Sequence, residues 1–237
     1  MKLIDYIPNF GFGIIAGDIG TGKSVTGYYI AELISAVRNK SIYIVGAPEP
    51  LKRLLPPKFN FCDDIHKLPK NCIILSDESY LLFYSREFYK DPNKFIDKLS
   101  GIVRHRKILA IFISQQLRKL DISIVASARF LIFKKPSLLQ SKFERKELRA
   151  LIENIIQKFK NVKNHLKSCY IITSDFEGML EDVIELPSWW NEEISTSFEN
   201  VLGNDDKTER TEVTIIKKGE DYAIITDDGR IFTNAEK

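Results

Sequence analysis

Short apolar runs alternate with amphipathic stretches along most of this chain, and the alternation predicts its secondary structure. Continuous apolar runs are typical of strands that are buried on both faces of a parallel sheet. Helical spacing predicts helices at 22–38, at 91–103 and from Pro136 to about Leu166. The predicted strands are 11–17, 41–48, 72–78, 108–114, 129–135 and 169–175. The pattern therefore indicates an α/β fold with a mostly parallel sheet flanked by helices.

Two segments interrupt this alternation. Residues 49–70 contain four prolines and are predicted mainly as loop. Residues 187–201, "PSWWNEEISTSFENV", are predicted to form a short helix with Trp189 and Trp190 near its start.

The character of the sequence changes after Gly203, where a polar linker begins. The linker is followed by a pattern that predicts two or three short antiparallel strands, with Asp228-Gly229 as a hairpin turn. We therefore expect a main domain at 1–203 and a small C-terminal β extension at 204–237.

Composition changes this picture little, but the distribution of charge adds to it. Apolar residues make up 44% and charged residues 28% of the 237 residues, and the net charge is +3. Residues 104–119 carry five basic and no acidic side chains, whereas 168–206 carry ten acidic and no Lys or Arg side chains. This distribution indicates one basic and one acidic surface, with ordinary solvated helix faces as the alternative.

The cysteines and the hydropathy exclude several classes of protein. Three cysteines, Cys62, Cys72 and Cys169, are too few for a disulfide framework and favour a reduced, intracellular chain. Cys62, His66 and Cys72 would supply only three zinc ligands without paired spacing, so we expect no zinc site. No apolar run approaches the roughly 20 residues of a membrane helix, and the N-terminus lacks a signal-peptide core.

The strongest motif is "GDIGTGKS" at 17–24, which fits G-x-x-x-x-G-K-[ST] between a predicted strand and a predicted helix. Its glycines let backbone N–H groups surround a phosphate, and the helix N-terminus attracts negative charge. In such a P-loop Lys23 reaches the β- and γ-phosphates of ATP, and Ser24 coordinates Mg²⁺. A glycine-rich turn that matches by chance is the alternative. The residues expected to bind the nucleotide are Gly17, Asp18, Ile19, Gly20, Thr21, Gly22, Lys23, Ser24 and Val25.

An acidic pair follows the third predicted strand in "CIILSDESY". Ligands of such sheets bind at the carboxyl ends of the strands, where Asp77 and Glu78 would lie. We expect Asp77 to hold the Mg²⁺ shell through water and Glu78 to activate the water that attacks the γ-phosphate. A solvated acidic pair at a strand end is the alternative.

The fourth predicted strand, "ILAIFIS", ends in a hydroxyl and two amides. If this strand lies beside "CIILSDE", Gln115 can bond the γ-phosphate or the attacking water, whereas Gln116 would point the other way. A strand-end amide that caps the next turn is the alternative. The chain has no N-K-x-D motif for guanine and no motif for a small phosphoryl acceptor, so water is the expected acceptor.

Together these motifs, with "RHRKILAIFISQQ" and "DISIVASARFLIFKKP", resemble the FtsK/HerA superfamily of DNA-pumping ATPases. The resemblance spans about Phe10 to Phe198, and "LPSWWNEEIS" is similar to a segment of genome-packaging ATPases of tailless and archaeal viruses. It implies a RecA-like (ASCE) P-loop NTPase fold and matches Gln115 to the family's sensor glutamine. Arg104, Arg106 and Arg129 match positions where the family places arginines, one of which enters the neighbouring subunit's site.

The resemblance implies an ATP-hydrolysing motor that packages double-stranded viral DNA into a capsid. Such a motor is a homo-oligomeric ring, a pentamer or a hexamer, in the host cytoplasm or associated with the virion or procapsid. Its expected partners are DNA, gripped through the phosphates, and capsid or portal-vertex proteins. The candidates to line the DNA channel are Lys52, Arg53, Arg118 and Lys119.

Two other functions stay open at this stage. Filamentous-phage assembly ATPases of the Zot type also have an Arg-His before this strand, but they usually carry a membrane span, and they would depend on coat protein. A slow ATP-gated switch or scaffold is the other function, and Glu78 beside Asp77 favours hydrolysis over it.

Overall fold

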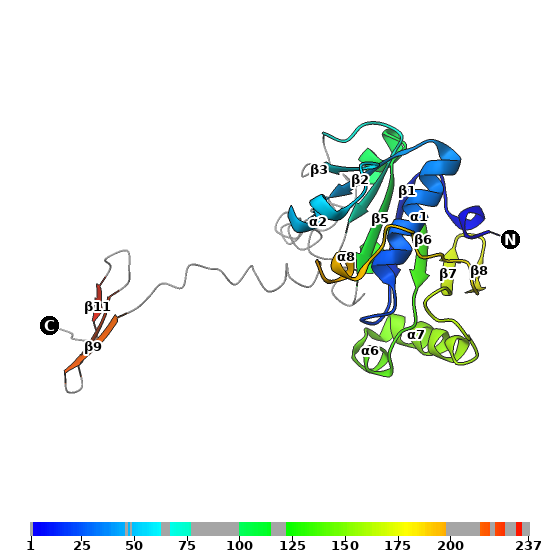
Figure 1. Ribbon diagram of the computed structural model, residues 1–237. Helices are drawn as coiled ribbons and strands as arrows, with labels where there is room; N and C mark the ends of the chain where they lie inside the picture. The colour runs from blue at the N-terminus through cyan, green and yellow to red at the C-terminus, as the bar shows by residue number, and fades with distance from the viewer. Residues whose placement is uncertain are drawn as a thin grey trace. The chain divides into compact units, whose positions relative to one another are not determined.

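The computed structural model describes residues 2–45, 47, 49–62, 67–76, 100–114, 122–197, 214–218, 221–225 and 231–233. Contacts divide the chain into two compact units, Met1–Ser195 and Thr196–Lys237, and each is described by itself (Figure 1). The boundary expected between 203 and 204 stays a prediction.

The first unit contains an eight-stranded sheet in the order β3-β2-β4-β5-β1-β6-β7-β8. The strands are β1 (Gly11–Ala16), β2 (Ser41–Val45), β3 (Phe59–Cys62), β4 (Cys72–Ser76), β5 (Leu109–Ser114), β6 (Phe130–Phe133), β7 (Cys169–Thr173) and β8 (Glu177–Leu180). The six strands from β3 to β6 run parallel, and β7 and β8 are antiparallel additions at one edge. The expected α/β fold with a mostly parallel sheet is therefore confirmed.

Strand β5 lies between β4 and β1, with Ile73 beside Leu109 and Ala16 beside Ser114. The role predicted for Gln115 requires "ILAIFIS" to lie beside "CIILSDE", and the pairing of β4 with β5 meets this condition. All six residues of β1 and of β5 are buried, which explains why both strands appear in the sequence as continuous apolar runs.

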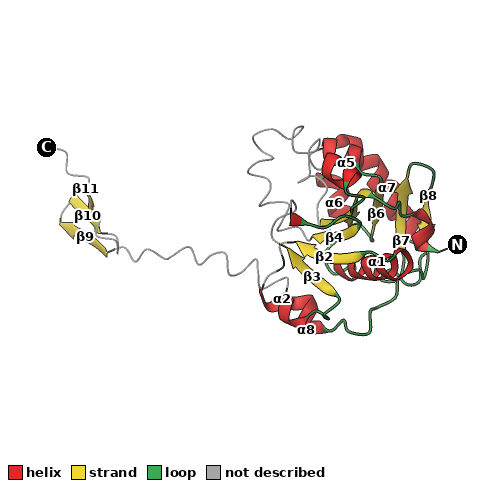
Figure 2. Ribbon diagram, turned by 90° about the horizontal axis from the view of Figure 1, so that it is seen from above, coloured by secondary structure: helices red, strands yellow, loops and turns green. Residues whose placement is uncertain are grey.

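Helices cover both faces of the sheet, as Figure 2 shows from above. The described helices are η1 (Leu3–Tyr6), α1 (Lys23–Arg38), α2 (Glu49–Leu54), α5 (Ile122–Ser127), α6 (Leu138–Phe143), α7 (Lys146–Phe159) and α8 (Glu192–Ser197), which begins in this unit and ends two residues beyond it. Helix α1 lies on one face and approaches β4 and β5 so closely that a Cβ at Gly27 would lie 2.8 Å from Ile113 Cδ1 and 3.0 Å from Leu75 Cδ1. On the other face, Ile152 and Ile155 of α7 join the core cluster.

The segment 49–70, predicted mainly as loop, contains helix α2 and strand β3, so this prediction was wrong for those residues. Strand β3 pairs with β2 at the edge of the sheet, and Phe59 is buried there. A four-residue edge strand between prolines gives too short a pattern to be recognised in the sequence.

The single long helix predicted from Pro136 to about Leu166 is also wrong, because the segment forms α6 and α7 and then turns. Neither Gly nor Pro marks the break. Glu144 is instead in an extended conformation, is buried, and accepts a hydrogen bond from Arg145 N through its carboxylate (3.1 Å). A local side chain-to-backbone bond of this kind competes with helix continuation.

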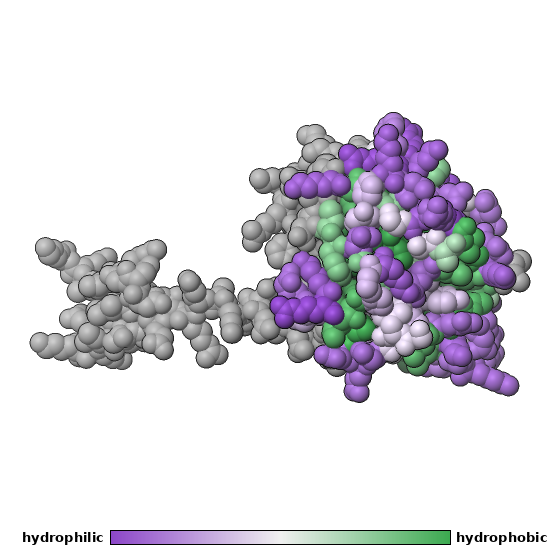
Figure 3. All heavy atoms as spheres, turned by 45° about the horizontal axis from the view of Figure 1, so that its top comes forward, coloured by the Kyte–Doolittle hydropathy of each residue, from purple (hydrophilic) through white to green (hydrophobic). Residues whose placement is uncertain are grey.

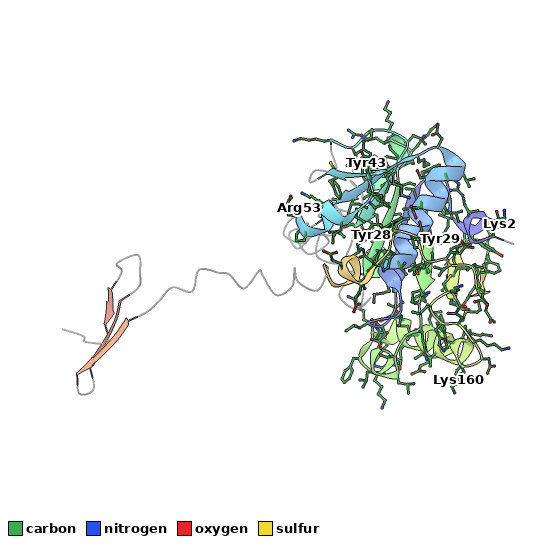
Figure 4. All side chains as sticks on the ribbon, in the orientation of Figure 1. Lys2, Tyr28, Tyr29, Tyr43, Arg53 and Lys160 are labelled. Atoms are coloured by element: carbon green, nitrogen blue, oxygen red, sulfur yellow. The ribbon has the colours of Figure 1, made fainter. Side chains whose placement is uncertain are left out.

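The tryptophans expected near the start of the last helix lie just before it, since α8 begins at Glu192 and Trp190 N donates to Pro187 O (2.9 Å). Trp189 packs on Tyr28 of α1 and on Phe59 of β3, with ring centroids 5.7 and 5.1 Å apart. The segment thus covers part of α1, on which Figure 4 labels Tyr28.

Two smaller expectations concern the remaining segments. Of the helix predicted at 91–103, only its C-terminal end lies in the described residues, where 100–105 are helical. The second unit contains a three-stranded antiparallel sheet, β9 (Thr214–Lys218), β10 (Asp221–Ile225) and β11 (Ile231–Thr233), which confirms the expected small β extension. The proposed turn at Asp228-Gly229 lies outside the described residues.

Candidate active site

The loop between β1 and α1 has the backbone of a glycine-dependent turn. Gly17, Gly20 and Gly22 have φ angles of 153°, 72° and 82°, a region that L side chains rarely adopt. Gly17 is also restricted by space, because a Cβ there would lie 2.8 Å from the Cβ and 3.0 Å from the carbonyl oxygen of Lys134. The motif glycines therefore have a local physical reason in this fold.

Three donors converge on Asp18 inside this loop. The Lys23 ammonium and the Thr21 hydroxyl both donate to Asp18 O at 2.7 Å, and the Asp18 carboxylate accepts from Ile19 N at 2.9 Å. Lys23 is 8% exposed, so its amino group is held against the loop rather than in solvent. An ammonium beside a glycine loop at a helix N-terminus favours a bound phosphate.

The strand ends beside the loop carry two buried hydroxyl groups. Ser76 ends β4 and Ser114 ends β5, and each is 1% exposed. The expected metal ligand and base, Asp77 and Glu78, follow Ser76 in the chain, and the expected sensor Gln115 follows Ser114. These three residues lie outside the described part of the chain, so their roles stay predictions.

The three expected arginines lie at the amino ends of the parallel strands, whereas the loop lies at their carboxyl ends. Arg104 and Arg106 precede β5, and Arg129 precedes β6, whereas the loop follows β1, which is parallel to both. A six-residue strand spans roughly 20 Å. Figure 1 shows the helix at 100–105 at the upper edge and α6, beside the loop, at the lower edge. These arginines are therefore too far away to serve the loop of their own subunit.

The turn that contains Arg106 is held from several sides. The Arg106 guanidinium donates to Leu68 O and Asn71 N donates to Arg106 O, both at 2.8 Å. The buried ammonium of Lys40 donates to Asn71 Oδ1 and to Lys107 O, also at 2.8 Å, and burial lowers the pKa of Lys40. Arg106 therefore has a structural role in this subunit.

Arg104 differs from the other two arginines. It is exposed, and its guanidinium has no partner among the described residues. Arg129 is also exposed, but its guanidinium carbon lies 5.5 Å from the centre of the Phe10 ring, and its side chain occupies the space where Gly11 would carry a Cβ. Arg104 is thus the expected arginine that lies on a helix, directly before the fixed turn, with its charged group exposed.

Two polar residues beside the loop were not predicted from the sequence. Gln140 of α6 donates to Gly17 O at 3.2 Å, across 123 positions of the chain. Lys134 is fully buried and donates to Leu166 O and Ser168 O at 2.8 and 2.7 Å, and burial lowers its pKa to about 8. In the sequence Lys134 belongs to a basic run that resembles a solvated surface, so no local signal distinguishes it.

The described residues offer little for other kinds of site. They contain no group of three or more His, Cys, Asp or Glu side chains that could hold a metal ion. Cys72 is buried and donates to Pro69 O, while His66 lies outside the described residues. None of the described helices is long and apolar enough to cross a membrane.

The candidate DNA-contacting residues are only partly described. Arg53 on α2 is exposed (Figure 4), whereas Lys52 is partly buried and pairs with Glu49 at 2.7 Å. Arg118 and Lys119 lie outside the described residues. On the face drawn in Figure 3, hydrophilic side chains predominate around the rim and hydrophobic ones form bands between them.

No family model and no curated protein matches this chain. Among solved structures, the DNA-packaging ATPase B204 from Sulfolobus Turreted Icosahedral Virus is 15% identical with a TM-score of 0.50, over 72% of this chain and 97% of that one.

The genome-packaging NTPase B204 from Sulfolobus turreted icosahedral virus 2 is similar in two further structures. Its complexes with ATP-gammaS and with sulfate give TM-scores of 0.51 and 0.52 at 13% identity, over 75% of this chain and 100% and 99% of those chains. At this identity the likeness shows the fold, and it agrees with the resemblance found in the sequence. The chain therefore has the P-loop NTPase fold of the viral genome-packaging ATPases.

Proposed function

We propose that this chain is an ATP-hydrolysing, DNA-translocating motor that packages double-stranded viral DNA into a capsid. The observation that carries the proposal is the glycine loop at the carboxyl edge of the sheet, with Lys23 held against Asp18 O at 2.7 Å. The order β4-β5-β1 supports it, because these neighbouring parallel strands all end on the side of the sheet where the loop begins, and ligands of such sheets bind there. The likeness to genome-packaging NTPases supports DNA packaging as the process that ATP hydrolysis drives.

In this proposal the loop residues Gly17–Ser24 hold the phosphates of ATP. Ser24 and Asp77 hold Mg²⁺, which neutralises charge that develops on the phosphates. Glu78 activates the attacking water, and Gln115 senses the γ-phosphate. Lys23 accompanies the β- and γ-phosphates as a fixed positive charge.

The same proposal makes the motor a ring in which each subunit completes its neighbour's site. Arg104 is the arginine that acts in trans, because it is exposed and its guanidinium has no partner among the described residues, whereas Arg106 is bonded to Leu68 O. An arginine supplied in trans can accelerate phosphoryl transfer by about 10³-fold or more. Arg53 is the described candidate for gripping DNA phosphates.

The decisive experiment is ATP hydrolysis with and without duplex DNA, on wild type and on Glu78→Gln. Wild type should be stimulated by duplex DNA of any sequence, because contacts to phosphates do not read bases. Glu78→Gln should bind ATP but turn it over about 10²-fold or more slowly, since it lacks the general base. Glu181→Gln, at an exposed position, is the matched control and should keep wild-type turnover.

Two outcomes would count against the proposal. Wild-type turnover in Glu78→Gln would remove the assigned base. A confirmed oligomer that hydrolyses ATP at low salt without any response to duplex DNA would favour the assembly ATPase, and dependence on coat protein would identify it. Slow turnover with nucleotide-dependent binding of a partner would favour the switch.

A further inference from the structure

A fixed turn at residues 164–168 lies beside Gly22 of the loop between β1 and α1, residues 17–24, which we call the phosphate loop for its proposed function. Ser168 Oγ donates to Asn164 O at 2.8 Å, and Lys167 N donates to Asn164 Oδ1 at 3.3 Å. The fully buried Lys134 donates to both Leu166 O and Ser168 O. The backbone of the turn is therefore held from within and by Lys134, which directly follows strand β6.

The turn carries Leu166 next to the start of α1. A Cβ placed on Gly22, the N-cap of that helix, would lie 3.6 Å from Leu166 Cδ2 and 3.3 Å from Val25 Cγ1. The two apolar side chains therefore border the same point, and Leu166 is 57% exposed. A single exposed leucine is ordinary on a protein surface, so its position beside the phosphate loop is what matters.

The order of the strands indicates which end of a bound nucleotide would face this point. Asp77, Glu78 and Gln115 follow β4 and β5, which lie on one side of β1, while β6 lies on the other side. Under the proposed function the γ-phosphate and Mg²⁺ belong to the β5 side. The nucleoside must then extend toward the β6 side, where Lys134 holds the turn that carries Leu166.

We propose that Leu166 and Val25 form the surface that binds the nucleobase when ATP is bound at the phosphate loop. The inference rests on the proposed nucleotide binding and adds the residues that hold the base. Binding sites for small molecules are lined mainly by apolar side chains, and a base placed here would cover exposed surface of Leu166. The fixed turn supplies this surface without the entropic cost of ordering a mobile loop on binding.

The test compares ADP with inorganic pyrophosphate, because the two ligands share a diphosphate and differ by adenosine. Dissociation constants are measured by titration calorimetry in the presence of Mg²⁺. Leu166→Ala should raise the Kd for ADP roughly five- to tenfold through lost apolar contact, and it should leave the Kd for pyrophosphate unchanged. Leu166→Met keeps the apolar surface and should retain wild-type affinity for both ligands.

Val37→Ala is the matched control, because Val37 is 65% exposed and lies near the other end of α1. It should change neither affinity. An unchanged Kd for ADP in Leu166→Ala would overturn the proposal, as would an equal loss for ADP and pyrophosphate, since Leu166 would then act on the loop itself. If the wild-type protein binds neither ligand, the proposed nucleotide binding is refuted, and with it the function on which the nucleobase-binding surface depends.

Discussion

Lys134 is a buried cation whose two hydrogen bonds go to backbone carbonyl oxygens. Its surroundings lower the pKa mainly through burial, from 10.5 to about 8, while the nearby Cys169 acts in the opposite direction. The carbonyls of Leu166 and Ser168 gain donors in return. Lys134 therefore stabilises one local arrangement beside the phosphate loop while it costs free energy as a buried charge.

This lysine predicts a pH dependence of stability. Between about pH 8 and pH 10.5 the unfolded chain keeps the Lys134 proton that the folded chain loses, so the contribution of Lys134 to the free energy of unfolding should rise with pH. Relative to Lys134→Met, wild type should gain up to about 1.4 kcal/mol per pH unit in this window, and nothing below it. Urea denaturation from pH 7 to pH 10 measures the difference.

Lys160→Met provides the comparison at an exposed lysine (Figure 4). The difference between this variant and wild type should not change over the same range of pH. A constant difference between wild type and Lys134→Met would show that Lys134 does not titrate in the window.

At the scale of elements, α6 is a short helix that depends on its cap. Ser137 Oγ accepts from Gln140 N at 3.2 Å, and the Gln140 side chain accepts from Ser137 N at 3.1 Å, so each residue satisfies an unpaired amide of the other. Gln140 also donates to Gly17 O. The cap therefore fixes the helix that contacts the phosphate loop.

Removing this cap should weaken the domain measurably. Ser137→Ala should lower the free energy of unfolding by about 1 kcal/mol, because Gln140 N loses its acceptor. Chemical denaturation at pH 7 is the measurement, and Ser174→Ala, at an exposed position, is the control. Equal stability of the two variants would mean that the capping box contributes nothing to the fold.

The elements also show how far the sequence could predict this molecule. Strands β1, β2, β4 and β5 could be predicted because each is a buried parallel strand and therefore an unbroken apolar run. Strands β3 and β8, each four residues long at an edge of the sheet, carry too little pattern. The break between α6 and α7 could not be predicted, because no Gly or Pro marks it and the extended, buried Glu144 at this point is seen only in the folded chain.

The candidate site divides in the same way. The glycine-dependent turn between β1 and α1 could be predicted because the residues of its motif are contiguous in the chain. The contacts of Lys134 and Gln140 with Gly17 join residues more than 100 positions apart, so only the folded chain reveals them. The roles of Asp77 and Glu78 rest on the sequence alone.

At the scale of the whole molecule, the phosphate loop and the exposed Arg104 lie at opposite ends of the parallel strands. A subunit built in this way cannot place its own arginine on its own nucleotide, but a head-to-tail neighbour can. Repetition of such a heterologous contact closes into a ring when the rotation permits it. Each active site of the expected motor therefore needs an intact loop from one subunit and an intact arginine from its neighbour.

Mixing two inactive variants tests this requirement. Lys23→Ala removes the loop lysine and Arg104→Ala removes the arginine, so each protein alone should lose about 10³-fold in ATP turnover. In an equimolar mixture an intact loop meets an intact arginine at about a quarter of the interfaces, so about a quarter of the wild-type rate should return. Steady-state ATP hydrolysis after mixing and reassembly measures the recovery.

Arg129→Ala, mixed in the same way, is the matched control. Arg129 stacks on Phe10 at the same edge of the sheet, so its loss should affect packing and leave a turnover close to that of wild type before mixing. If the Lys23→Ala and Arg104→Ala mixture forms oligomers but stays inactive, Arg104 does not act on a neighbour. If Arg104→Ala alone keeps full turnover, a different residue must stabilise the charge on the transferred phosphoryl group.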